Sequence, residues 1–248
     1  MANSSSSEPI LDIIAQPSKK AGEKSHYLGH RDRLRHKVLT FGSDVLQDYE
    51  LLEMLLTYAI PRRDVKPLAK ELISSFGSFS AVLNASPEEL KRIKGIKDNT
   101  AALIVTARGC ALRMMKNQFS SGPIIKDWKS LIEYCKADMG QMKNECLRII
   151  FLDSRSQLIR DEILQKGTVS QTPVYPREIA KRALELGAVS IVMVHNHPAC
   201  DMRPSKNDIQ MTKAVQNALA PLDISLIDHI IISKSGHISF KACGFLKD

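Results

Sequence analysis

The sequence has few of the features that mark secreted or membrane-spanning proteins. Its five cysteines are scattered through 248 residues and form no CxxC pair, so neither a disulfide framework nor a structural zinc knuckle is indicated. No apolar run approaches the roughly 20 residues that a membrane span requires. The Ser-rich N-terminus holds one apolar patch, which Asp12 interrupts, so no signal peptide is expected. We therefore expect a cytoplasmic protein with no membrane partner.

The sequence also lacks the motifs of two common groups of zinc enzymes. Helical zinc proteases carry His-Glu-x-x-His, and zinc deaminases carry His-x-Glu with Pro-Cys-x-x-Cys. Neither pattern occurs in the chain. Both reaction classes are therefore excluded.

The charge is only moderately unbalanced, at +8. Residues 1–125 carry 18 Lys and Arg against 13 Asp and Glu, and residues 126–248 carry 17 against 14. An excess of this size is compatible with nucleic acid as a partner. Mixed charges spread over both halves are more typical of a solvated surface, so charge alone does not predict DNA binding.

The first half of the chain is predicted to be helical after a flexible tail. Residues 1–29 are rich in Ser and Lys and poor in large apolar groups, a composition that cannot offset the entropy of ordering. Residues 30–118 place apolar side chains at helical spacing between Gly and Pro breaks, which predicts a small all-helical domain. The expected helices are residues 31–41, 48–60, 64–76, 79–83, 87–93 and 99–115.

The second half of the chain is predicted to be an α/β domain. Residues 117–123 are polar and contain Gly122 and Pro123, so a linker is predicted at residues 119–125. From residue 126 to 248, β-branched runs alternate with amphipathic segments. The expected helices are residues 126–136, 176–186 and 205–220, and the expected strands are residues 146–152, 158–165, 188–194, 224–233 and 237–241.

The run His195-Asn196-His197-Pro198 follows directly on the strand predicted at residues 188–194. Residues i and i+2 of an extended chain point to the same side, so both imidazoles are presented together. Asp208 stands where a helix can begin and turn its carboxylate towards the histidines. Two His and one Asp leave the fourth position of a zinc site open, as in catalytic sites, where the metal lowers the pKa of water from ~15.7 to about 7. The predicted chemistry is metal-dependent hydrolysis.

The same residues have a simpler interpretation, which the sequence leaves open. Ser205 followed three positions later by Asp208 fits a helix capping box, which needs no metal. Paired histidines at a strand end can also be ordinary loop residues. The base that a hydrolase needs is open as well, because Glu145, Glu162 and Glu178 are all candidates.

The segment around Gly95 resembles a helix-hairpin-helix, whose hairpin amides hold a DNA backbone phosphate. Lys97 replaces the second glycine of that pattern. Its side chain can hinder close approach of a backbone, and its ammonium can itself meet a phosphate. Gly95 and Lys97 are therefore candidate DNA-backbone contacts, with a purely structural turn between packed helices as the alternative.

The order of the candidate site residues resembles that of a known metalloprotease fold. A Glu ahead of a strand, then His-x-His, then Ser-x-x-Asp is the pattern of the JAB/MPN-plus domain, also called JAMM, which has a three-layer α/β fold like that of cytidine deaminase. Longer stretches resemble the RadC family and extend the likeness over about residues 28–245. These stretches are residues 29–34, 48–52, 61–69, 76–78 and 174–179.

The resemblance implies a role for each residue of the motif. His195, His197 and Asp208 would be the ligands of Zn²⁺. Glu145 would be the general base that deprotonates the attacking water, and Ser205 would donate a hydrogen bond to the developing oxyanion. Deubiquitinating members of the wider fold cleave isopeptide bonds. The implied function is a zinc-dependent hydrolase of the JAMM metallopeptidase or isopeptidase type, with an unknown protein or peptide substrate.

A second hypothesis follows from the older association of RadC proteins with DNA repair. The helical domain would then bind DNA during repair or recombination, and the metal site would be nucleolytic or non-catalytic. Salt-dependent binding to DNA distinguishes this hypothesis from the first.

The sequence departs from the RadC pattern in the loop after the histidines. The family usually has Ser-Gly after His-Asn-His-Pro, whereas this chain has Ala199-Cys200. Loss of the glycine restricts the loop, and a thiol near zinc can ligate the metal or be oxidised. A small apolar filler is the alternative role of Cys200.

Two further pairs of residues are given structural roles. Asp228-His229 also matches the family's sequence, and a core histidine bonded to a backbone carbonyl is the expected role there. Arg177-Glu178 are expected to begin a helix, with a role at the rim of the site as the alternative.

Overall fold

The computed structural model describes residues 23–166, 175–199 and 201–246. The chain divides into two compact units, Met1–Glu71 and Leu72–Asp248. Within the described ranges, no helix combines the length and the apolar character that crossing a membrane requires.

The first unit contains α1 (Glu23–Phe41), α2 (Asp48–Ala59) and the first residues of α3 (Lys66–Phe76). A capping box between Gln47 and Glu50 fixes the start of α2, and its C-cap residue stands immediately before Pro61, where the sequence predicts the helix to stop. Leu52 and Leu56, one turn apart on α2, are fully buried. The apolar residues that the sequence places at helical spacing therefore form the packed face of α2.

The start of α1 differs from the prediction. Residues 1–22 of the predicted tail lie outside the described residues, but residues 23–29 belong to α1. The sequence predicts the first helix only from residue 31, after Gly29. A single interior glycine costs only about 1 kcal/mol relative to alanine, which a long helix tolerates.

The second unit begins with short helices that lead into one long helix. These are α4 (Phe79–Asn84), α5 (Pro87–Lys91) and α6 (Asp98–Ser120). The sequence predicts that α6 ends near residue 115, but Phe119 is fully buried and its ring lies 5.3 Å from that of Tyr134. This packing carries the helix into the predicted linker at residues 119–125.

A mixed sheet of five strands follows, in the order β2-β1-β3-β4-β5. Only β3 and β4 are parallel, and the other neighbouring strands are antiparallel. Every residue of β1 is buried because β1 lies inside the sheet and is covered on both faces. The strands are β1 (Cys146–Leu152), β2 (Leu158–Lys166), β3 (Ser190–Asn196), β4 (Ser225–Ile232) and β5 (His237–Ser239).

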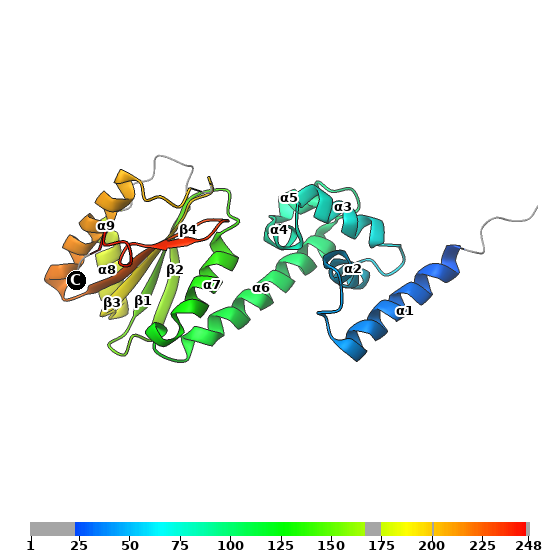
Figure 1. Ribbon diagram of the computed structural model, residues 1–248, viewed down its shortest axis with the longest axis horizontal. Helices are drawn as coiled ribbons and strands as arrows, with labels where there is room; N and C mark the ends of the chain where they lie inside the picture. Colours follow the sequence, from blue (N-terminus) through cyan, green and yellow to red (C-terminus); the bar gives the residue numbers. More distant parts are fainter. Residues whose placement is uncertain (1–22, 167–174, 200, 247–248) are drawn as a thin grey trace, which may run out of the picture. The chain divides into compact units, whose positions relative to one another are not determined.

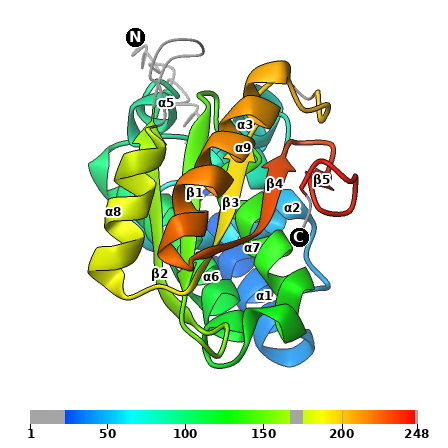
Figure 2. The ribbon, with the colours of Figure 1, turned by 90° about the vertical axis from the view of Figure 1, so that its left-hand side faces the viewer.

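Helices cover both faces of this sheet, so the domain has three layers (Figure 1). On one face, α7 (Trp128–Met139) packs against alternate strand residues such as Ile150 and Val192. On the other face, α8 (Pro176–Leu186) and α9 (Lys206–Leu219) lie side by side (Figure 2) over residues such as Ile149 and Met193. The short helices η1 (Ile124–Asp127) and η2 (Ala220–Leu222) complete the domain. The predicted α/β domain after a helical region is confirmed.

Strand β1, an interior strand of the sheet, carries a charge into the α7 side of the core. Arg148 is only 3% exposed. Its guanidinium lies 2.9 Å from the carboxylate of Asp161 on β2, contacts Asp138 on α7, and donates to the hydroxyl of Tyr134 at 2.6 Å. Lys116 on α6 lies 3.0 Å from Asp161. This buried network joins α6, α7 and two strands, and such a network is costly to break once its charges are out of water.

Replacing Tyr134 by Phe is expected to destabilise the chain by about 1.5–3 kcal/mol, the usual contribution of hydrogen bonds to charged groups. Burial raises the pKa of Tyr134, so its hydroxyl stays protonated and donates to Asp161 at 2.7 Å. Urea unfolding measures the change. The matched control, Tyr58→Phe, alters an exposed tyrosine on α2 and should leave the stability within about 0.5 kcal/mol of wild type. Equal effects in both variants would contradict a special role for the network.

Candidate metal centre

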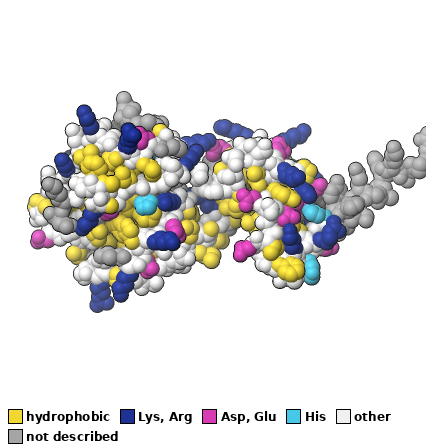
Figure 3. Space-filling model, in the orientation of Figure 1, with side chains coloured by type: hydrophobic (Ala, Val, Ile, Leu, Met, Phe, Trp, Pro, Cys, Tyr) yellow, Lys and Arg dark blue, Asp and Glu magenta, His cyan; other side chains and the backbone are white. Residues whose placement is uncertain are grey.

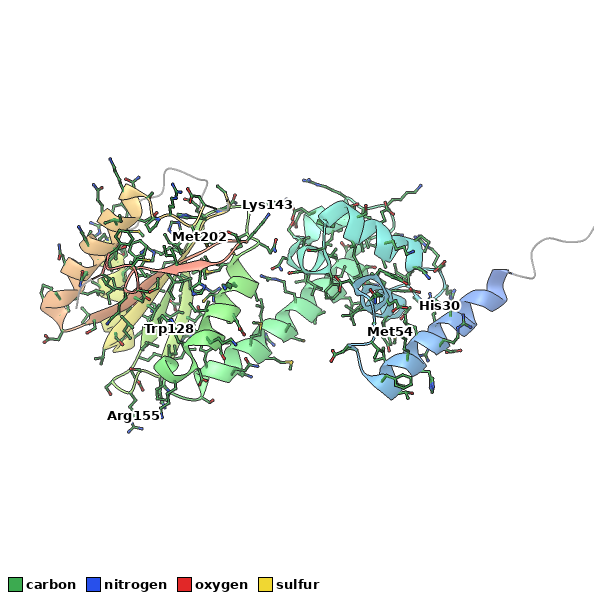
Figure 4. The ribbon with its side chains drawn as sticks, in the orientation of Figure 1. His30, Met54, Trp128, Lys143, Arg155 and Met202 are labelled. Atoms are coloured by element: carbon green, nitrogen blue, oxygen red, sulfur yellow. The ribbon has the colours of Figure 1, made fainter. Side chains whose placement is uncertain are left out.

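The candidate site lies at one end of the sheet, where β3 ends and β1 begins. These strands are antiparallel neighbours, and Leu147 pairs with His195. In Figure 4, Lys143, in the loop before β1, and Met202, in the loop before α9, lie at this end, whereas Arg155 marks the opposite end. The loops that hold the remaining candidate residues therefore meet where the two histidines leave the sheet.

His195 and His197 lie on one side of the chain, with their ring centres 4.9 Å apart. The strand assignment extends through Asn196, so His195 lies within β3, slightly later than the predicted strand end. The Nδ1 of His197 lies 2.7 Å from the backbone carbonyl oxygen of Asp201. Donation of that N–H leaves the lone pair on Nε2, which is how metal-binding histidines are usually oriented.

Asp208 approaches both histidines from the first turn of α9. Its Oδ1 lies 3.3 Å from Nδ1 of His195, and its Oδ2 lies 3.4 Å from Nε2 of His197. Burial by itself raises the pKa of Asp208, but the two imidazoles and the hydrogen bonds from Ser205 hold it well below its usual range. The residue is therefore an anion although it is buried.

These three side chains form a group close enough to hold one metal ion. Bonds of about 2.0–2.1 Å at tetrahedral angles place neighbouring donor atoms about 3.3–3.4 Å apart. The separations of Asp208 Oδ1 from His195 and of Asp208 Oδ2 from His197, 3.3 and 3.4 Å, are close to this value, and one ligand atom of each residue lies within 4.8 Å of the others. In addition, Nδ1 of His195 is buried without a hydrogen-bond partner among the described residues. The donor set and its orphaned nitrogen fit a metal ion such as zinc.

Glu145 is the candidate base that lies beside this group. Its Oε2 is 4.0 Å from Nε2 of His195, and its side chain is 39% exposed, so it also reaches solvent. Glu162 instead pairs with Arg182, at 2.6 Å, and Glu178 lies against Arg177 in the first turn of α8. Of the three glutamates that the sequence left open, Glu145 is the one that geometry favours.

Ser205 caps α9, as the simpler interpretation of the sequence expects. Its hydroxyl oxygen accepts from the backbone N–H of Asp208 at 3.1 Å, and Oδ2 of Asp208 accepts from the N–H of Ser205 at 2.7 Å. The capping box and the histidine contacts use the same carboxylate. The two interpretations therefore do not exclude each other.

Comparison with known proteins places the chain in a family. Residues 125–245 match the RadC-like JAB domain, and residues 26–102 match the UPF0758 N-terminal domain. A UPF0758 protein of Ruegeria pomeroyi is 43% identical over 222 residues, which cover 90% of this chain and 99% of that relative. The chain belongs to the RadC family. The JAB fold of its C-terminal domain includes hydrolases.

In this RadC-family chain, the sequence did not predict that Thr212 and His229 contact the candidate metal ligands. Thr212 donates to the backbone carbonyl oxygen of Asp208 at 2.6 Å and lies 2.7 Å from Nδ1 of His229. The ring of His229 stacks on that of His195 with centres 6.2 Å apart. Burial, followed by the nearby His195, lowers the pKa of His229 to about 3, so it is neutral. The sequence predicts that His229 bonds to a backbone carbonyl. That prediction is wrong, because a threonine hydroxyl from α9 takes the place of the carbonyl.

Other residues that the sequence analysis of this RadC-family chain named are Asp228, Arg177, Ala199 and Cys200. The buried Asp228 carboxylate accepts from the backbone N–H groups of His229, at 2.7 Å, and Lys241, at 3.0 Å. Arg177 lies in the exposed first turn of α8, as expected. Ala199 is exposed, and Cys200 lies outside the described residues.

The predicted hairpin is also present. Gly95 joins α5 to α6 with a φ of 104°, in the region that favours glycine, and Lys97 is the exposed N-cap residue of α6. Across the hairpin, Lys91 lies 3.2 Å from Asp98. The segment is a short turn between two helices, and the lysines at residues 91, 94 and 97 around it are exposed.

Proposed function

We propose that this chain is a zinc-dependent hydrolase of the JAMM metallopeptidase or isopeptidase type, acting on a protein or peptide. The observation that carries the proposal is the close grouping of His195, His197 and Asp208, which each offer one ligand atom within 4.8 Å of the others, with Oε2 of Glu145 4.0 Å from Nε2 of His195. Three protein donors and an open fourth position are typical of catalytic zinc, whereas structural zinc takes four protein ligands.

Each group of the site would have a different role in the proposed hydrolysis. Bound zinc would polarise a carbonyl group and supply a nucleophile at neutral pH, because it lowers the pKa of water to about 7. Glu145, half in solvent, can accept the proton of the attacking water and deliver it to the leaving nitrogen. The oxygen of Ser205 already accepts a hydrogen bond, so its own proton remains to donate to the oxyanion.

The test of the proposal is metal content followed by hydrolysis, on the purified full chain. We expect one zinc ion per chain, and cleavage of peptides or of amides on a lysine side chain that a chelator stops and added zinc restores. Testing both classes of substrate separates peptidase from isopeptidase activity. A chain that holds no stoichiometric metal and takes none up would end the proposal.

A second candidate function is DNA binding by the helical region. The observation in its favour is the Gly95 hairpin, around which Lys91, Arg92, Lys94 and Lys97 are all exposed. Backbone amides at a helix N-terminus and nearby cations are the usual means of holding a phosphate. Against a broad binding surface, basic and acidic side chains are interspersed on the face drawn in Figure 3. We therefore propose a local contact with the DNA backbone.

The DNA hypothesis predicts a salt-dependent affinity that the hairpin lysines alter. Each lysine that meets a phosphate contributes about 0.9 to the slope of log K against log salt concentration, so Lys94→Ala and Lys97→Ala should each reduce the slope by about that amount. Titrations of duplex and branched DNA over a salt series measure the slope. Lys213→Ala, an exposed position on α9, is the matched control. Binding that does not depend on salt, or equal slopes in all variants, would count against the hypothesis.

A further inference from the structure

Asn196, between the two histidines, points away from them into the sheet and is only 1% exposed. Its Oδ1 accepts the backbone N–H of Cys146 at 2.7 Å. Its Nδ2 donates to the backbone carbonyl oxygen of Asn144 at 3.0 Å. The two groups that it binds belong to the residues immediately before and after Glu145.

The side chain of Asn196 takes the place of a backbone pairing between β1 and β3 that the sheet lacks at this point. The pairing of β1 with β3 ends at Leu147 and His195, and the next pair in that register would be Cys146 with Asn196. At that point the N–H of His197 bonds to the carbonyl oxygen of Ile232 in β4, at 2.7 Å. The backbone of β3 is thus bound to β4 beyond His195, and the amide of Asn196 makes the connection to the β1 side.

The two hydrogen bonds of Asn196 restrict the position of Glu145. With both flanking peptide groups fixed, the backbone of Glu145 has little freedom, and its side chain is directed to the face of β1 on which His195 lies. We propose that Asn196 is a positioning residue, which holds Glu145 beside the metal ligands. The inference rests on the proposed hydrolase function, because it assigns Glu145 the role of base.

The chemistry of the contact explains why an asparagine is needed. One acceptor and one donor must act from a single planar group of fixed length. Aspartate provides the acceptor for Cys146 but has no donor for Asn144, and alanine provides neither. The side chain of Asn144 itself is exposed and only its backbone takes part, so Asn144→Ala is a matched control in the same loop.

We call the two hydrogen bonds from Asn196 to the backbone of Cys146 and Asn144 the clamp. The first measurement tests this clamp on the metal-free full chain. Loss of a buried hydrogen bond is expected to speed exchange of the Cys146 amide hydrogen about ten-fold in Asn196→Ala. Asn196→Asp should keep most of the protection, because its carboxylate still accepts, and Asn144→Ala should match wild type. An unchanged exchange rate in Asn196→Ala would overturn the clamp.

The second measurement tests whether the clamp acts through Glu145. The probe is Co²⁺, whose visible absorption responds to the groups around the ion, recorded at one pH for the wild type, Asn196→Ala, Glu145→Gln and the double variant. We expect each single variant to bind Co²⁺ with an affinity within about three-fold of wild type and to change the spectrum. In the double variant, Asn196→Ala should add no further change, which is the sign of one shared effect.

The outcomes separate this inference from the proposed function. A spectral change by Asn196→Ala that is equally large in the Glu145→Gln background, or the absence of any change, would overturn the positioning role. Failure of the wild-type chain to take up Co²⁺ would instead reject the proposed function and, with it, the role of Glu145 as base. The exchange measurement would still decide whether Asn196 holds the loop.

Discussion

The His197→Ala variant is expected to bind zinc at least about a hundred-fold more weakly than the wild-type chain. Structural zinc sites with four ligands bind with apparent free energies of about 10–16 kcal/mol, so one ligand contributes about 2.5–4 kcal/mol, or two to three powers of ten in affinity. The loss should be at the upper end here, because only His195 and Asp208 would remain. Zinc content after dialysis, together with a competition titration, measures the change.

The control for this variant is another histidine of the same domain. His237 lies on β5 and is exposed, and it does not belong to the group that could hold a metal. His237→Ala should therefore keep the zinc content of the wild type. If His197→Ala retained stoichiometric zinc, the assignment of the ligands would be wrong, whatever the activity of the chain.

The Glu145→Gln variant is expected to keep its metal and to lose hydrolysis. A positioned general base contributes about 10²–10⁴-fold to a rate, and glutamine has nearly the same shape but cannot take the proton. Because Glu145 is not part of the ligand group, zinc affinity should change little. Rates measured at saturating zinc, with the variant's zinc content determined in parallel, separate loss of the base from loss of the metal.

Glu178→Gln is the matched control for the loss of a carboxylate. Glu178 lies in the exposed first turn of α8, beside Arg177. Its removal should leave the rate unchanged. An unaltered rate in Glu145→Gln would remove Glu145 from the mechanism, and the role proposed for Asn196 would fall with it.

The sequence predicted those parts of the site that depend on local geometry. The alternation of an extended chain brings His195 and His197 together, and the capping pattern of Ser205 and Asp208 locates the start of a helix. Both expectations hold because they involve residues close in the chain. The element pattern predicted the α/β domain for the same reason.

The remaining features depend on which strands pair and in what register. Glu145 could not be distinguished from Glu162 by spacing, because only the antiparallel pairing of β1 with β3 brings it to His195. The contacts of Asn196 likewise join residues about fifty positions apart along the chain. Arg148, in the middle of an apolar strand, gave no sign in the sequence of the partners that come from α7 and β2.

The length of α6 limits where the chain can be divided. A cut at the predicted linker would remove Phe119 from the core of the α/β domain, and a cavity of that size costs about 3–5 kcal/mol. The same cut would remove Lys116 and leave more of the charge of Asp161 uncompensated. A fragment that keeps these contacts of the α/β domain therefore starts within α6, several residues before the boundary that Gly122 and Pro123 suggest.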